Sequence, residues 1–215
     1  ILNNDINEKT LQFLHDLVHK YKIAVTTPGG FHHSEQYYGF MNQGGAASVL
    51  MPIWYMGRFL DFMPDLKGRI VIRPLPSWQK GGDRSAGMGG TGTAIPKQSN
   101  QVELAKDFLK FSKVSKEGNV KLWTVLGFDP PRWDVWSDPA LKEDNKYTEY
   151  FANGKHIFDM LQQVRDEINP LYLSPQFPQA ADLVNRKVLF NAINTESQTP
   201  GEALEAAADE LKLTQ

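Results

Sequence analysis

Cysteine is absent from the 215-residue sequence. Without thiols the chain has no thiolate nucleophile, no cysteine-ligated zinc and no disulfide, a composition that fits an oxidising compartment. Apolar runs of the roughly 20 residues that a membrane span needs are also missing. The chain begins with ILNND and not with a charged and then apolar leader. We therefore expect a soluble chain that is either processed or a fragment.

Neither sign of charge dominates. The 23 basic and 25 acidic residues give a formal net charge of -2, so no basic surface is available to release counterions from nucleic acid. We expect no nucleic-acid partner. With 41% hydrophobic residues, the chain can bury the core of one large domain or of two small ones.

Helical and strand-like segments alternate along the chain. Residues 8–22 place apolar side chains, from Leu11 to Tyr21, on one face of an amphipathic helix. The apolar runs 47–55 and 69–76 suit buried strands. Further helices are expected at residues 102–114, 116–126, 146–168, 178–193 and 200 onward. The predicted class is α/β with many helices.

Several residues mark the expected helix ends. Asn100 with Glu103 has the spacing of a capping box, and Ser115 can cap the next helix, which Gly127 would end. The sequence TPGE at 199–202 combines a threonine cap, a proline at the first helical position and a glutamate at the third.

Residues 87–92 have the sequence GMGGTG, which satisfies the glycine spacing of a dinucleotide-binding fingerprint. Such a site needs a strand that runs into the first glycine and a helix that begins at the last one. Here the strand-like run ends at Pro76, and the next helix is expected only near residue 101. We therefore reject a dinucleotide site and interpret the glycines as backbone that bends freely or is closely approached.

Two histidine pairs were tested as metal ligands. His32 and His33 are adjacent, so they point in different directions on a regular element, and no fourth ligand has suitable spacing. His15 and His19 have the i, i+4 spacing of zinc-binding pairs, but the sequence HDLVH lacks a glutamate after the first histidine. Solvated helix-face residues are the simpler interpretation, and we expect no metal site.

Three aspartates keep an enzymatic alternative open. Asp129, Asp134 and Asp138 lie among aromatic residues, and a glycosidase needs two carboxylates across a sugar cleft. Nothing in the sequence sets two of them at a catalytic separation, and aspartates that cap loops are the default. The nucleophile motif G-x-S-x-G is absent. A non-enzymatic interaction domain that binds no sugar is a further possible function.

Four segments occur in a characteristic order: MNQGGAASVLMPIWYMGRF, RIVIRPLP, a long stretch from GGTGTAIPK to GNVKLW, and GFDPP. This order resembles the C-terminal half of the extracellular solute-binding proteins of carbohydrate ABC transporters, the group of the maltose- and glycerol-phosphate-binding proteins. The resemblance covers about residues 8–215. It implies a type II periplasmic-binding-protein architecture, in which two α/β lobes close on a ligand.

The resemblance also implies a domain layout and a function. Residues 1–88 would form the first part of the C-terminal lobe, 89–138 the crossover and N-terminal-lobe helices, and 139–215 the second part of the C-terminal lobe. The expected function is a periplasmic or cell-surface subunit of an ABC importer that binds a sugar or sugar derivative without turnover. We expect a monomer that works with a membrane permease and needs no cofactor.

Sugar sites combine aromatic platforms for C–H faces with polar groups for the hydroxyl rim. Trp54 follows the expected strand at a proline bend and matches the family's sugar-stacking tryptophan; a core tryptophan is the alternative interpretation. The resemblance assigns Gly89 and Gly90 to the crossover, where main-chain N–H groups can approach a hydroxyl closely. Thr91 is a candidate hydroxyl donor.

Three further residues are candidate ligand contacts. Arg132 and Trp133 lie in the irregular stretch PPRWDVW, where a guanidinium can fork onto paired hydroxyls; surface packing of this loop is the alternative. Phe177 lies near the position where relatives place another ligand aromatic. Trp78 and Trp136 are expected only to pack.

Overall fold

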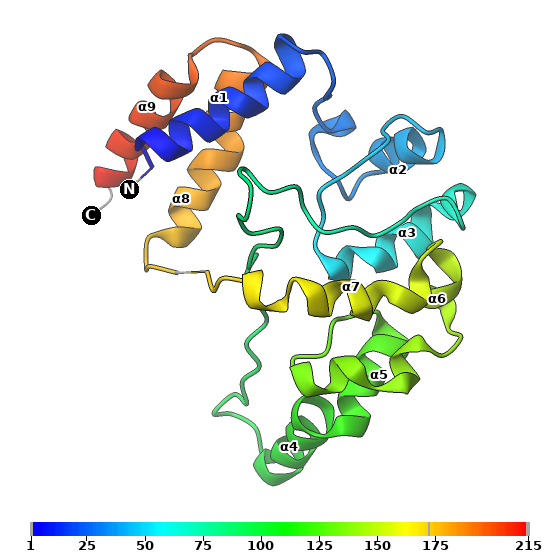
Figure 1. The fold of residues 1–215 in the computed structure, drawn as a ribbon. Coiled ribbons are helices and arrows are strands. Elements are labelled where there is room, and N and C mark those ends of the chain that lie inside the picture. The colour runs from blue at the N-terminus through cyan, green and yellow to red at the C-terminus, as the bar shows by residue number, and fades with distance from the viewer. Residues whose placement is uncertain (1, 172, 214–215) are drawn as a thin grey trace. The chain divides into compact units, whose positions relative to one another are not determined.

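The computed structural model describes residues 2–171 and 173–213 (Figure 1). The chain divides into two compact units. The first unit joins Ile1–Tyr37 to Tyr172–Gln215, and the second unit is Tyr38–Leu171. These units are defined on this chain alone. The lobes expected at 1–88, 89–138 and 139–215 concern the complete two-lobe architecture and stay a prediction.

Helices make up the regular structure of the described residues, in which no strand occurs. The α-helices are α1 Asp5–His19, α2 Glu35–Asn42, α3 Met56–Phe62, α4 Val102–Leu109, α5 Lys116–Leu126, α6 Lys146–Tyr150, α7 Ile157–Gln163, α8 Phe177–Leu183 and α9 Pro200–Lys212. Shorter 3-10 or π-helical turns are η1 Pro28–Gly30, η2 Ile53–Tyr55, η3 Pro64–Leu66, η4 Lys110–Val114, η5 Trp133–Ser137, η6 Pro139–Lys142, η7 Gly154–His156, η8 Arg165–Glu167, η9 Val184–Val188 and η10 Phe190–Asn194. Among the described helices, none is both long and apolar enough to cross a bilayer.

The first unit has a core shared by α1, α9 and the helical stretch from α8 to η10, which Figure 1 draws side by side in blue, red and orange. Its buried members are Leu11, Leu183, Val188, Ala192, Ile193, Ala203, Leu204 and Ala207. The small alanines of α9 allow close approach of its neighbours. Of the face predicted for the first helix, Leu11 is buried, whereas Tyr21 lies beyond the end of α1 and is exposed.

Helix α9 begins with the predicted capping box. The Thr199 hydroxyl accepts a hydrogen bond from the Glu202 backbone N–H at 3.3 Å, and the Glu202 carboxylate accepts one from the Thr199 backbone N–H at 2.8 Å. The latter bond, with the Thr199 hydroxyl, lowers the pKa of Glu202. Two N–H groups that the helix leaves unpaired are thereby satisfied.

Thr199→Ala should lower the free energy of unfolding by about 1 kcal/mol, because an N-cap acceptor is lost. Urea denaturation followed by circular dichroism measures the change, with Thr199→Ser as the control that keeps the hydroxyl. Since the Glu202 carboxylate is a stronger acceptor than its protonated form and its pKa is lowered, its contribution to stability is full above the ordinary glutamate pKa and is lost as the pH falls through the lowered pKa. Equal stability of the alanine and serine variants would contradict this role.

The second unit contains an aromatic core around Phe158. Its ring stands edge-on to Trp123 at 4.9 Å and 89° and lies 6.0 Å from Trp136. Both indoles are buried, and both N–H groups donate to backbone carbonyls, at 3.0 Å to Leu141 and at 2.9 Å to Pro130. The hydrogen bonds fix α5 and the loop between α5 and α6, and the Phe158 ring contacts add α7 to this core. The packing role expected for Trp136 is confirmed.

The strands expected at 47–55 and 69–76 are not present in the described structure. Residues 45–52 are irregular and lead into η2, and residues 70–76 are extended without a neighbouring strand. A β-strand exists only within a ladder of backbone hydrogen bonds. Here the Asn153 side-chain amide fills that role, because it accepts from the Ile72 N–H and donates to the Ile72 carbonyl, both at 2.9 Å. The predicted α/β class is therefore not seen in these residues.

The single helix expected over 146–168 is also wrong, because the chain breaks between α6 and α7. Asn153 leaves the helical path to bind Ile72. Gly154 then lies so close to the backbone of Thr148 that no Cβ would fit. A long-range hydrogen bond and a close backbone approach thus override the helical periodicity.

The other predicted helix ends give a mixed result. Ser115 caps α5 by accepting from the Gly118 N–H at 2.9 Å, and Gly127 ends the helix with a left-handed φ of 72°, both as predicted. The capping box at Asn100 is wrong, because Gln101 is the N-cap of α4 and its side chain makes no capping bond.

Candidate functional site

Trp54 projects from the surface of the second unit. It lies in η2, the turn that begins directly after Pro52, and 40% of its surface is exposed. The next two residues, Tyr55 and Met56, are buried, so they anchor the turn that carries the indole. The Tyr55 ring stands edge-on to it at 5.8 Å. Within this chain, therefore, the indole is not part of the buried core.

The glycine-rich segment 87–92 belongs to the same unit and has no regular structure. No helix begins at Gly92 in this described stretch, since α4 starts only at Val102. The reason for rejecting a dinucleotide site is confirmed. Gly89 has a φ of 122°, which side chains disfavour, and Gly89, Gly90 and Thr91 are all exposed. Their backbone is accessible to a ligand.

Arg132 has its guanidinium already engaged. Nε and Nη2 donate to the Asp134 carboxylate, with the Nε bond at 3.0 Å, and Nη1 donates to the Val114 carbonyl at 2.8 Å. The hydrogen bonds from Arg132 lower the pKa of Asp134. The guanidinium that was expected to bind sugar hydroxyls thus stabilises its own loop, which fits the alternative of surface packing.

Trp133, beside Arg132, is exposed at the start of η5. The Arg165 guanidinium carbon lies 5.8 Å from its ring centre, and the Trp136 ring lies at the same distance on the core side. The Trp133 indole is therefore held by Arg165 and Trp136 and still exposes part of its aromatic surface. Trp78, which was expected to pack, exposes 73% of its surface.

Phe177 is the first residue of α8 and is exposed. It belongs to the first unit, whereas the other candidate residues belong to the second. Its assignment as a ligand contact stays a separate prediction.

Two of the three aspartates of the enzymatic alternative, Asp134 and Asp138, are engaged in structural bonds. Asp138 caps η6 by accepting from the Ala140 N–H at 2.9 Å and pairs with Lys116 at 2.6 Å. The Lys116 contact, then the Ala140 N–H, lowers the pKa of Asp138, as Arg132 does for Asp134. A glycosidase acid needs a raised pKa. Neither carboxyl has the environment of such an acid.

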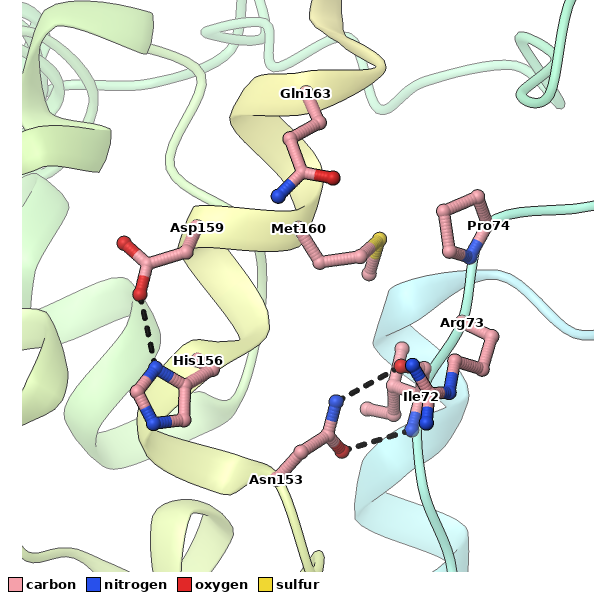
Figure 2. Close-up of a pocket in the computed structure, with 8 residues that line it drawn as sticks. All are labelled: Ile72, Arg73, Pro74, Asn153, His156, Asp159, Met160 and Gln163. Atoms are coloured by element: carbon pink, nitrogen blue, oxygen red, sulfur yellow. Dashed lines mark hydrogen bonds and ion pairs between the residues drawn. The ribbon is translucent and has the colours of Figure 1, made fainter.

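A cavity that the sequence did not suggest lies between the extended residues 72–74 and helix α7 (Figure 2). Its volume is about 340 Å³, at the lower end of the range for ligand pockets. The lining residues are Ile72, Arg73, Pro74, Asn153, His156, Asp159, Met160 and Gln163. Figure 2 shows Asn153 bridging to Ile72 and the Met160 side chain reaching toward the extended segment.

The polar groups of this cavity bind mainly one another. His156 Nδ1 lies 3.1 Å from Asp159 Oδ2, and Lys142 Nζ lies 2.6 Å from the other oxygen of that carboxylate. Lys142, followed by His156, lowers the pKa of Asp159. Because none of the eight lining residues is Phe, Tyr or Trp, the cavity lacks the large flat platform that sugars favour. Trp54 and Trp133 supply that chemistry elsewhere in the unit.

Comparison with known families decides the broader assignment. The family model of the bacterial extracellular solute-binding proteins matches residues 2–117. The chain belongs to this family. The resemblance seen in the sequence is thereby confirmed, and membership implies the periplasmic-binding-protein fold.

Two curated relatives match nearly the whole chain. The arabinooligosaccharide-binding protein of Bacillus subtilis (strain 168) is 66% identical over 212 residues, which are 99% of this chain and 49% of the relative. The protein of the same name from Halalkalibacterium halodurans is 50% identical over 211 residues, which are 98% of this chain and 47% of the relative. The chain therefore spans about half the length of these relatives.

Proposed function

We propose that the protein is the extracytoplasmic sugar-binding subunit of an ABC importer and that its ligand is an arabinose-containing oligosaccharide. The observation that carries the proposal is the 66% identity over 99% of the chain to a protein named for binding arabinooligosaccharides. The name of the second relative gives the same ligand class. Both relatives are named as binding proteins, so the sugar is held and released without cleavage.

Trp54 is the proposed main platform for the sugar. Its indole is partly exposed, while the residues after it are buried, so an aromatic face is held on a rigid turn. An indole can cover the apolar C–H face of a pentose ring. Trp133 is the candidate for a second platform, with Arg132 orienting the loop through Asp134.

The crossover segment supplies the polar part of the proposed site. Gly89 and Gly90 leave their backbone N–H groups uncovered by side chains, and Thr91 adds a hydroxyl. Such groups can donate to sugar hydroxyls on the rim of the ring. We propose that this segment and Trp54 bind the same ligand. Phe177 stays a separate candidate, which Phe177→Ala tests by itself.

An exposed apolar face on α4 and η4 supports the proposal that the complete protein has two lobes. Within the described helix α4 no residue is buried. Its apolar side chains and those of η4 face solvent, namely Leu104, Phe108, Phe111 and Val114. An amphipathic helix of a folded protein buries its apolar face. We propose that the half of the relatives' length not spanned by this chain covers that face and pairs with the extended segments.

The partners follow from the importer role. A membrane permease would receive the loaded protein on the outer side of the cytoplasmic membrane, in the periplasm or at the cell surface. We propose a monomer as the working form.

A thermal-shift screen of the full-length protein over mono- and oligosaccharides tests the function. A ligand at 100 times its dissociation constant stabilises the folded state by about 2.7 kcal/mol. We expect arabino-oligosaccharides to raise the melting temperature more than glucose-based oligosaccharides of equal length do. Hydrolysis products in the same samples would support the glycoside-active enzyme. No shift with any sugar would favour an interaction domain.

A further inference from the structure

We propose that His15, His19 and Glu196 form a binding site for a transition-metal dication such as Zn²⁺. The two histidines lie on α1, and the glutamate follows η10 in the same unit. One ligand atom from each residue lies within 4.8 Å of the others, so among the described residues these three side chains are close enough together to bind one metal ion. The site shares no residue with the proposed sugar site.

The spacing of the ligand atoms fits a zinc ion. His15 Nε2 lies 3.3 Å from Glu196 Oε2, and His19 Nδ1 lies 3.2 Å from Glu196 Oε1. Zinc binds nitrogen and oxygen at about 2.0–2.1 Å, so adjacent ligand atoms of a tetrahedron are about 3.3 Å apart. The i, i+4 spacing brings both imidazoles to one face, and their ring centres are 4.7 Å apart.

The imidazole of His19 has an acceptor for the proton on its outer nitrogen. His19 Nε2 lies 2.7 Å from the Ile193 carbonyl, which can only accept, so this nitrogen is the donor. His15 Nδ1 is buried and makes no hydrogen bond to the described residues; Asp16 Oδ1, which accepts from the Gln12 amide at 2.7 Å, lies 3.5 Å away. Such outer partners fix the tautomer of metal-binding histidines.

In a neutral His19 imidazole the proton is on Nε2, so a lone pair on Nδ1 faces a carboxylate oxygen of Glu196, which is also an acceptor. His15 Nε2 faces the other oxygen of this carboxylate. Two acceptors that face one another need a proton or a metal ion between them. A metal ion satisfies the inner nitrogens and Glu196 at once. The C-terminal turn of α1, where His19 lies, further favours positive charge.

The backbone at Glu196 supports a role for its side chain. Glu196 has a φ of 50°, in the left-handed region that favours glycine or asparagine after a helix. A glutamate there is sterically disfavoured. Unlike glycine, Glu196 places a carboxylate against the histidines of α1. The side chains of His15 and His19 are 22% and 26% exposed, so both are partly covered where the sequence indicated a solvated helix face.

Three protein ligands leave a fourth position of a tetrahedral ion for water. Imidazole and carboxylate together suit zinc, and copper(II) would bind more tightly in the general order of metal affinities. Because the ligands come from α1 and from the turn before α9, a bound ion would cross-link distant parts of the sequence within the first unit.

Isothermal titration of the metal-stripped full-length protein with Zn²⁺ tests the proposal. We expect one zinc ion to bind per protein molecule. The affinity should fall more than about 100-fold in Glu196→Gln and in His19→Ala, since loss of a residue that only hydrogen-bonds to a metal ligand already costs about 10- to 100-fold. The matched control is His156→Ala, which removes an exposed histidine paired with Asp159 and should leave this binding unchanged.

Thermal denaturation separates metal binding from folding. In EDTA, Glu196→Gln should melt at the temperature of the unmodified protein, and added Zn²⁺ should raise the melting temperature of the unmodified protein but not of the variant. The proposal is overturned if the unmodified protein shows no saturable zinc binding, or if Glu196→Gln binds zinc as tightly as the unmodified protein does. Retained sugar binding in either case leaves the transport function intact.

Discussion

Trp54→Ala in the full-length protein is expected to weaken sugar binding by at least about 30-fold. An aromatic anchor at the centre of a binding site commonly contributes about 2 kcal/mol or more, which corresponds to that change in the dissociation constant. The fold should persist, because Trp54 is 40% exposed while its neighbours Tyr55 and Met56 form the buried anchor. Titration calorimetry with an arabino-oligosaccharide measures the loss, and circular dichroism checks the helices.

Trp78→Ala is the matched control for this prediction. Trp78 is a second tryptophan of the same unit, with 73% of its surface exposed, and no ligand role is assigned to it. Its removal should leave the dissociation constant unchanged. If Trp54→Ala binds as tightly as the unmodified protein, Trp54 does not belong to the site. Equal losses in both variants would show a general effect of removing surface tryptophans.

Phe108→Asp is expected to destabilise the full-length protein by at least about 3 kcal/mol. Phe108 is 65% exposed in this chain, but the proposed two-lobe organisation places it under the remaining half of the protein. Truncation of a buried phenylalanine costs about 3–5 kcal/mol, and a buried unpaired charge adds to that cost. Denaturant unfolding of the full-length protein measures the change.

Lys113→Asp provides the comparison, because it changes charge at an exposed position of the adjoining turn η4. Surface substitutions of this kind usually change stability by less than about 0.5 kcal/mol. If Phe108→Asp is as mild as Lys113→Asp, the apolar face of α4 is uncovered in the complete protein. The proposed lobe contact would then be wrong.

Local sequence signals predicted the helix ends that depend on neighbouring residues. The Ser115 cap, the left-handed Gly127 and the capping box at Thr199 all form, because each needs only groups within one turn of chain. The break between α6 and α7 could not be found in this way. It depends on Asn153 binding Ile72, which is 81 positions away.

The strand predictions failed for a related reason. Residues 69–76 have suitable composition, yet a ladder needs a partner strand, and composition does not say whether a partner is present. The interpretation of residues 87–92 as backbone that bends freely or is closely approached fits Gly87. Its backbone lies so close to the Asn169 carbonyl that a Cβ would collide, although the sequence did not identify Asn169 as the neighbour.

Candidate site residues were predicted with uneven success. Trp54 was singled out from its place after a proline, and its exposure fits a platform. Arg132 was assigned to hydroxyls, but its neighbour Asp134 takes the guanidinium. The grouping of His15 and His19 with Glu196 was beyond sequence reasoning, because 177 positions separate the second histidine from the glutamate and only the packing of α1 brings them together.

The most direct test of the central claim is one experiment on the full-length protein with a defined arabino-oligosaccharide. Calorimetric titration gives the binding isotherm, and chromatography of the same sample after long incubation gives the state of the sugar. The proposed function predicts saturable binding with one site per protein and recovery of the oligosaccharide at its original length. Release of shorter sugars, or the absence of any saturable binding, would contradict it.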